Sequence, residues 1–307
     1  GPGTSNESGP PVRITDPRQA PPSTGATIKA YVELTKPRNI ELLLTTTIPA
    51  MLDAEQGWPD PRLMVATLLG GTRSAGGANA IHNVIDRDID VGRRRTHNRP
   101  LPSSRVRPGP ALAFGIALGA AGFAVLWATS NLLAAMLSTA GLLFYVFVYT
   151  MYLKRSSTQN IVVGGAAGAV PALVGWAAVT GSLALPAWIM FAIVFFWTPP
   201  HFWALALRYQ DDYAVAGVPM LPVVVGPRRT IEHIEVYTWV LVGVSLLLYP
   251  TGAVGLIYLI SALVLGAWLL AAAYRLQRRT GEAMRFFGFS NLYLALLSLA
   301  MIVDVLV

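Results

Sequence analysis

The sequence predicts an all-α, polytopic membrane protein with nine transmembrane helices and a cytoplasmic amino terminus. Three observations support this fold class. Hydrophobic residues make up 54% of the 307 residues and charged residues only 13%, whereas soluble domains have about 25% charged residues. Long apolar segments recur along the chain. Lysines and arginines gather in alternate loops. Together these features favour a bundle of helices in a bilayer.

The apolar segments define the predicted spans, because a helix needs roughly 20 mostly apolar residues to cross a membrane. Lipid does not tolerate exposed non-helical backbone, so each segment is expected to be a helix. The predicted spans are 36–53, 63–85, 109–129, 131–150, 159–180, 186–207, 232–250, 253–274 and 286–306. They form one predicted transmembrane domain over residues 27–307. Residues 1–26 are rich in Pro, Gly, Ser and Thr, which predicts a disordered tail.

The basic residues orient these spans. All lysines and arginines except Arg62 and Arg73 lie in the amino-terminal segment up to Arg38, where the first span opens, or in the loops that follow spans two, four, six and eight. The positive-inside rule then predicts that these loops are cytoplasmic and that the carboxyl terminus is outside. The net charge of +7 therefore indicates contact with lipid rather than with nucleic acid. The absence of a visible transit signal favours a bacterial plasma membrane. Arg73, inside a span, has no role here beyond pairing with a carboxylate such as Glu41.

A candidate metal site follows the second span. Asp86 and Asp90 are four residues apart, so on a continuing helix they share one face, with Asn79 and Asn83 on or near it. Paired carboxylates suit Mg²⁺, which prefers oxygen ligands and commonly bridges to phosphates. The alternative is a solvated charged turn. Acidic residues that face inward at a membrane boundary favour a functional site, because they are costly there.

Arginines follow these carboxylates directly. Guanidinium groups make bidentate contacts with phosphate oxygens, so Arg95 and Arg99, with Arg93 and Arg94, are candidates for binding a diphosphate. Carboxylates for a metal beside arginines for an anion predict a metal–diphosphate site. Arg105 and Arg107 are more typical of anchors on the membrane face.

A second polar loop begins where the sixth span ends. Asp211 and Asp212 are adjacent, so a helix can aim only one of them at the first cluster. Arg208 precedes Asp212 by four residues, a spacing at which the two can pair. Gly217 and Pro219 then end the helix. We expect this segment to form the second half of the metal–diphosphate site, with Asp211, Asp212 and Arg208 as candidate residues.

Further candidates lie on the same side of the membrane. Lys36 and Arg38 open the first span and Lys154 ends the fourth, where each can reach phosphates or anchor to lipid headgroups. His201 lies within the sixth span, beside Pro199 and Pro200. It is a candidate for ligating a haem iron or orienting a polar substrate group, and equally for a packed histidine with a structural hydrogen bond.

Several strings resemble the UbiA superfamily of intramembrane prenyltransferases, and within it the protohaem IX farnesyltransferase branch. They are TKPRN at 35–39, DRDIDVGRRRTHNRPLP at 86–102, QNIVVGGAAGAVPALVGWAAVTG at 159–181, WTPPHFWALAL at 197–207 and DDYAVAGVPMLP at 211–222. Two positions depart from the superfamily pattern. His82 stands where an Asn usually precedes the first Asp by four residues. Either Asn79 or Asn83, a candidate substrate-binding residue, substitutes for that Asn, or metal binding is altered. Ala216 stands where the second motif usually ends in Asp, which implies a weaker second metal site.

The resemblance implies a reaction. Farnesyl diphosphate is ionised with Mg²⁺, a vinyl group of haem b captures the allylic cation, and water adds to give haem O and diphosphate. It implies that Asp86, Asp90 and Asp212 act in catalysis through the metal, and that the active site faces the cytoplasm. Membrane lipids and downstream haem-modifying or oxidase-assembly proteins are expected partners.

Two alternatives stay open at this stage. The first is a UbiA-type prenyltransferase with another aromatic or macrocyclic acceptor, against which the setting of His201 argues. The second is a transport or haem-binding membrane protein without catalysis. Such a protein would not need carboxylates beside an arginine run at the end of a helix.

Overall fold

The computed structural model describes residues 25–26, 28–29, 40–85, 108–153, 160–215, 217 and 219–307. Every element in these ranges is a helix, which confirms the predicted all-α class. The long helices are α2 (Ile40–Glu55), α3 (Pro61–Ile85), α5 (Pro108–Thr129), α6 (Leu132–Leu143), α8 (Asn160–Thr180), α9 (Leu185–Arg208), α12 (Pro227–Leu246), α13 (Leu256–Arg278) and α14 (Ala283–Leu306). A π-helix, η3 (Phe144–Leu153), continues α6.

Each of the nine predicted spans contains a helix of the structure. Within the described ranges, six helical segments are long and apolar enough to cross a membrane on length and composition alone, and they begin at Gly109, Ile161, Leu185, Pro227, Leu256 and Thr280. α2 has only 16 residues, and α3 carries Arg62 and Arg73 among many polar and small residues. The full count of nine spans and the cytoplasmic amino terminus stay predictions.

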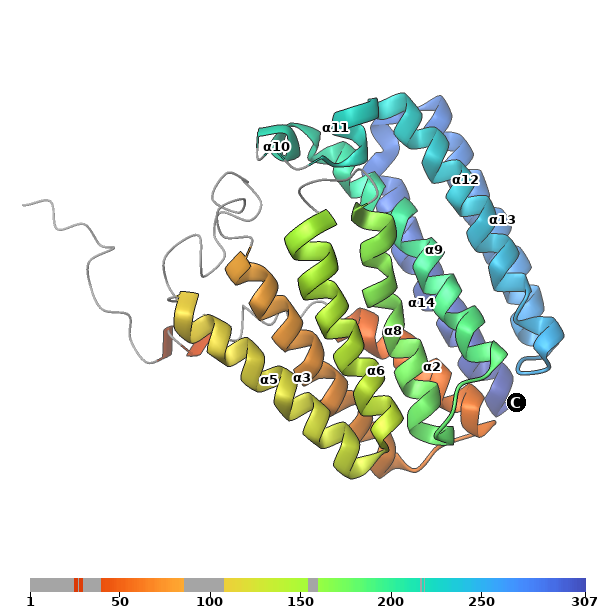
Figure 1. Cartoon of the computed structure of the whole chain (residues 1–307). Coiled ribbons are helices and arrows are strands. Elements are labelled where there is room, and N and C mark those ends of the chain that lie inside the picture. Colours follow the sequence, from red (N-terminus) through yellow and green to blue (C-terminus); the bar gives the residue numbers. More distant parts are fainter. Residues whose placement is uncertain are drawn as a thin grey trace, which may run out of the picture.

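The long helices form an antiparallel bundle (Figure 1). Two short helices, α10 (Gln210–Val215) and α11 (Leu221–Val225), cover one end of it. We call this the α10 end; the carboxyl terminus lies at the opposite end, which we call the far end. α3 and α9 both start at the far end, so their carboxyl ends reach the α10 end together. The segments that follow these two helices are the two acidic motifs of the sequence.

Glycines set the closest helix contacts in the bundle. α3 packs along α5, and a Cβ at Gly77 would lie 2.6 Å from the carbonyl oxygen of Gly115. A Cβ at Gly175 of α8 would lie 2.7 Å from the carbonyl oxygen of Thr47 on α2. No side chain fits in either space, so these glycines allow backbone to approach backbone, as is common between helices in lipid.

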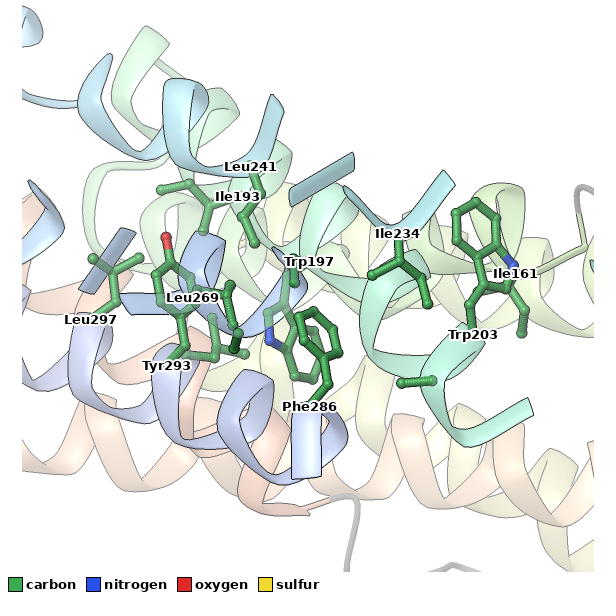
Figure 2. Packing of buried hydrophobic residues seen from close by; sticks show 14 of the residues in the cluster. Ile161, Ile193, Trp197, Trp203, Ile234, Leu241, Leu269, Phe286, Tyr293 and Leu297 are labelled. Carbon is green, nitrogen blue, oxygen red and sulfur yellow. The ribbon is translucent and has the colours of Figure 1, made fainter. Parts of the chain in front are cut away.

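The main core joins α9, α12, α13 and α14. Figure 2 shows part of this cluster, in which Trp197 of α9, Ile234 of α12, Leu269 of α13 and Phe286 of α14 are all buried. Large apolar side chains also cover the outside of the bundle, among them the exposed tryptophans Trp127, Trp188 and Trp239. An apolar exterior around an apolar core is the arrangement expected in lipid.

Candidate functional site

A cavity of about 430 Å³ lies inside the bundle between α2, α3, α6, η3, α8, α9 and α10. Its volume is in the range of pockets that bind small molecules and cofactors. The wall is apolar over much of its area, and polar side chains are spread along it, among them Ser74, Ser138 and Thr198. The described structure therefore contains a chamber suited to a largely apolar ligand.

α3 supplies one wall of this cavity. Thr67, Gly71, Ser74, Ala78 and His82 line it at spacings of three or four residues, which places them on one face of the helix. Their small or polar side chains explain why this stretch has the least apolar composition of the long helices before α12. The pattern was visible in the sequence, but it was not used there to predict a lining face.

His82 marks the α10 end of that wall. It is only 2% exposed, and its ring centroid lies 5.1 Å from that of Tyr145, a second lining residue. Asn79 also lines the cavity, whereas Asn83 is buried but does not. The sequence had offered both asparagines as stand-ins for the usual Asn of the motif. The structure brings Asn79, not the predicted substrate residue Asn83, together with His82 in the cavity.

Tyr145 reaches the cavity from η3. This segment was predicted as the end of an ordinary helix, but it winds as a π-helix from Phe144 onward. π-Helical turns are rare and are frequent at functional sites. The sequence analysis did not identify Tyr145, because no local sequence signal used there separates a π-helix from an α-helix.

α8 and α9 form the opposite wall. α8 contributes small residues, including Gly164, Gly168 and Pro171, and α9 contributes Thr198 and Phe202. A Cβ at Gly168 would meet no atom within 4 Å, so the cavity is open in front of this glycine. Small residues on α8 thus create much of the space in the chamber.

The second acidic motif lies at the α10 end. Asp211 and Asp212 are in the first turn of α10, followed by Tyr213, which is 5% exposed and lines the cavity. Asp212 is half-buried, whereas Asp211 and Arg208 are exposed. α9 ends at Arg208, Tyr209 caps it and α10 begins at Gln210, so Arg208 and Asp212 lie on two consecutive helices.

Most of the remaining candidates lie outside the described residues: Lys36, Arg38, Asp86, Asp90, Arg95, Arg99 and Lys154. Asp86 is the residue that directly follows the end of α3 at Ile85. In the described part of the chain, no three His, Asp or Glu side chains gather in a way that could hold a metal ion. The predicted Mg²⁺ site depends on Asp86 and Asp90, so it stays a prediction.

His201 lies between α9 and α14. Its ring stacks against Trp197 and Phe287, with centroids 4.3 and 4.2 Å away, and Nδ1 lies 2.6 Å from Ser290 Oγ. The side chain is 6% exposed and is not among the residues that line the cavity. Of the two roles left open by the sequence, this geometry favours the packed histidine with a structural hydrogen bond.

Known proteins resemble the chain over nearly its whole length. Residues 43–298 match the UbiA prenyltransferase family. Protoheme IX farnesyltransferase 2 of Saccharopolyspora erythraea is 55% identical over 282 residues, covering 90% of this chain and 86% of the relative. Protoheme IX farnesyltransferase of Gloeobacter violaceus is 52% identical over 286 residues, covering 92% and 94%.

Solved structures show the same fold. A digeranylgeranylglyceryl phosphate synthase superposes with a TM-score of 0.75 at 21% identity, covering 91% of this chain and 98% of that one. A UbiA homologue from Archaeoglobus fulgidus bound to DMAPP and Mg²⁺ gives a TM-score of 0.63 at 16% identity, covering 89% and 99%. From the sequence match and the shared fold it follows that this chain is a member of the UbiA prenyltransferase family.

Proposed function

We propose that the protein transfers the farnesyl group of farnesyl diphosphate to a vinyl group of haem b with addition of water, forming haem O and diphosphate. The observation that carries this proposal is the extent of the likeness to protoheme IX farnesyltransferases, at 52–55% identity over at least 90% of the chain. The buried cavity is consistent with it, since both the isoprenoid chain and the macrocycle are apolar.

The reaction centre is proposed at the α10 end of the cavity. His82 and Tyr213 line the cavity there, and each belongs to one acidic motif, because Asp86 follows His82 by four residues and Asp212 directly precedes Tyr213. Asp86, Asp90 and Asp212, with Asp211, would hold Mg²⁺ through carboxylate oxygens, the ligands it prefers. When bound, the ion would neutralise negative charge on the diphosphate.

The basic residues complete this proposal. Arg95, Arg99, Lys36, Arg38, Lys154 and Arg208 would bind the diphosphate. Charge builds on it as the bond between farnesyl C1 and the bridging oxygen breaks, and fixed cations stabilise that charge. Diphosphate leaves with the electron pair. The vinyl group forms the new carbon–carbon bond, and water then adds to the resulting cation and loses a proton.

The middle of the cavity protects the reactive cation. Gly71, Ala78, Gly168 and Pro171 line it there and offer no nucleophile. The hydroxyl groups of Ser74 and Thr198, which also line it, donate to backbone carbonyl oxygens. Excluding water from a reactive intermediate is a recognised function of a closed site. His201 is proposed to hold α9 against α14, so that Thr198 and Phe202, which line the cavity from the neighbouring face of α9, keep their places in the wall.

We further propose that residues 27–307 act as one transmembrane domain in a bacterial plasma membrane, with the α10 end toward the cytoplasm. The clustering of lysines and arginines in loops at that side of the predicted topology supports this orientation.

Mass spectrometry of extracted haem tests the proposed reaction. The purified protein would be incubated with haem b, farnesyl diphosphate and Mg²⁺. The expected product is a haem heavier by a farnesyl group and one water. Release of diphosphate only when another aromatic or macrocyclic acceptor is supplied would instead identify a sibling activity, and no release with any acceptor would contradict a transferase.

A further inference from the structure

α8 carries a proline on the wall of the cavity. Pro171 lies inside this helix, and both Pro171 and Ala167, one turn before it, line the cavity and are partly exposed. In a regular α-helix the N–H of residue 171 would donate to the carbonyl oxygen of residue 167. Proline has no N–H, and its ring pushes against that carbonyl. The carbonyl oxygen of Ala167 is therefore without its helical partner.

The freed oxygen faces the cavity. The carbonyl of a helical residue points along the axis toward the residue four positions later, so this oxygen lies between Ala167 and Pro171, which both line the cavity. Gly168 also lines it, and a Cβ there would meet no atom within 4 Å. Among the described residues, no backbone N–H from outside α8 donates to this oxygen. The wall thus presents the negative end of a backbone dipole to the interior.

This oxygen lies at the depth of the His82–Tyr145 pair. Gly141 of α6 contacts Val170 of α8, because a Cβ at Gly141 would lie 3.1 Å from the valine side chain. α6 continues into η3 and runs antiparallel to α8 (Figure 1). From that contact Tyr145 is four residues nearer the α10 end and Ala167 three, so their depths differ by about 2 Å. The ring centroids of Tyr145 and His82 are 5.1 Å apart.

That depth is where the donor would ionise. α3 ends at Ile85, three residues after His82 and directly before Asp86. The proposed metal–diphosphate site therefore begins about one helical turn nearer the α10 end than this level. C1 of farnesyl diphosphate is bonded directly to the diphosphate, so it lies next to that site on the cavity side. The carbonyl of Ala167 is then beside C1, and the tail of the donor extends beyond it.

We infer that the carbonyl oxygen of Ala167 stabilises the farnesyl cation while the bond between C1 and the bridging oxygen breaks. The electron pair of that bond leaves with the diphosphate, and positive charge develops on the allylic carbons. A fixed dipole with its negative end toward this charge stabilises it without reorganisation, and more strongly in an enclosed site than in water. The oxygen forms no bond to carbon. Pro171 is a positioning residue, and the inference deepens the proposed function and rests on it.

Binding of a charged and a neutral chain tests this inference without the acceptor. Protonated farnesylamine carries a positive charge next to C1, and farnesol is its neutral counterpart. Each would be titrated into the purified protein with inorganic diphosphate and Mg²⁺. Pro171→Ala restores the N–H and so occupies the carbonyl of Ala167. We expect it to weaken binding of farnesylamine by about tenfold, as for loss of one hydrogen bond to a charged group, and to leave binding of farnesol unchanged.

Steady-state kinetics with haem b give a second measurement. In Pro171→Ala, kcat should fall by about tenfold while the KM for farnesyl diphosphate stays the same, because the dipole acts on the cation and not on the intact donor. A higher KM with unchanged kcat would show that Pro171 only shapes the binding site, and would overturn the inference.

Two further variants separate the carbonyl from the shape of the helix and of the cavity. Pro49→Ala replaces the proline inside α2, which does not line this cavity, and should bind both ligands as the wild type does. Val174→Ala removes as many carbon atoms from the wall as Pro171→Ala, and should affect the two ligands equally.

Three binding results would overturn the inference: unchanged binding of farnesylamine in Pro171→Ala, equal weakening of both ligands in that variant, or the same selective loss in Val174→Ala. The expected selectivity without any farnesylated haem from the wild type would instead contradict the proposed function alone.

Discussion

Nδ1 of His201 lies 2.6 Å from Oγ of Ser290, and this contact joins α9 to α14. Ser290 Oγ in turn donates to the carbonyl oxygen of Phe287 at 2.8 Å. The imidazole is stacked between two aromatic rings, so it is held on both faces and at one edge.

His201→Ala should therefore act on stability. Losing two aromatic contacts and a buried hydrogen bond is expected to lower the free energy of unfolding by about 3 kcal/mol. Thermal unfolding in detergent measures this loss. The absorption spectrum of added haem b should be the same for wild type and variant. A change in that spectrum would show that His201 ligates the iron, as one sequence hypothesis held.

The two acidic residues of α10 should differ in importance. Asp212 is half-buried next to the cavity residue Tyr213, whereas Asp211 is exposed. Asp212→Asn is expected to slow transfer by about a hundredfold, as when one electrostatic contact to the developing charge is lost. Asp211→Asn is the matched comparison and should slow transfer less, because the exposed carboxylate of Asp211 would hold the metal less directly. Equal losses in both variants would mean that the motif acts as a pair rather than through one carboxylate.

Asp304 caps α13 from a distant part of the chain. Its carboxylate accepts hydrogen bonds from the backbone N–H groups of Gly255, at 2.6 Å, and Tyr258, at 2.9 Å. Asp304→Ala should lower the free energy of unfolding by about 2 kcal/mol, at the upper end for loss of a helix cap. Activity below the unfolding temperature should be retained, because the site is at the other end of the bundle.

Glu282 provides the control for that measurement. It lies at another helix end, but its contacts with Arg279 and Arg285 are at 4.0 and 3.6 Å and the arginines are largely exposed. Exposed ion pairs of this kind contribute about 0–1 kcal/mol. A Glu282→Ala variant destabilised as much as Asp304→Ala would refute the specific role of the cap.

Much of the fold could be predicted from the sequence, because the requirement to span lipid imposes long apolar segments. Each predicted segment contains a helix, and the helix ends at Thr129 and Thr180 were predicted to the residue. The predicted start at 36 lies outside the described residues, and the fourth segment changes to a π-helix at Phe144. Whether a segment winds as an α-helix or a π-helix depends on tertiary packing, and the spacing of apolar residues in the sequence does not show it.

The site was harder to predict, for a physical reason. α9 is apolar on all sides, so its sequence does not show whether Thr198 and Phe202 or Trp197 and His201 face the cavity. A helix that is apolar on every face has no amphipathic signal to orient it. The polar residues of α3 do follow a helical period, and that pattern would have identified its cavity face. The carboxylates Asp86 and Asp90 remain sequence predictions.

The most direct test of the account is whether blocking this cavity stops the reaction. Gly168 lines the cavity and Gly243 is exposed on α12, and a Cβ at either position would meet no atom within 4 Å. Neither position has an atom in the way of a Cβ, so phenylalanine is introduced at both. Three proteins would be incubated with haem b, farnesyl diphosphate and Mg²⁺: wild type, Gly168→Phe and Gly243→Phe. The mass of the extracted haem would then be measured by mass spectrometry. The account predicts farnesylated, hydrated haem from wild type and Gly243→Phe and none from a folded Gly168→Phe. Normal product from Gly168→Phe, or no product from wild type, would contradict it.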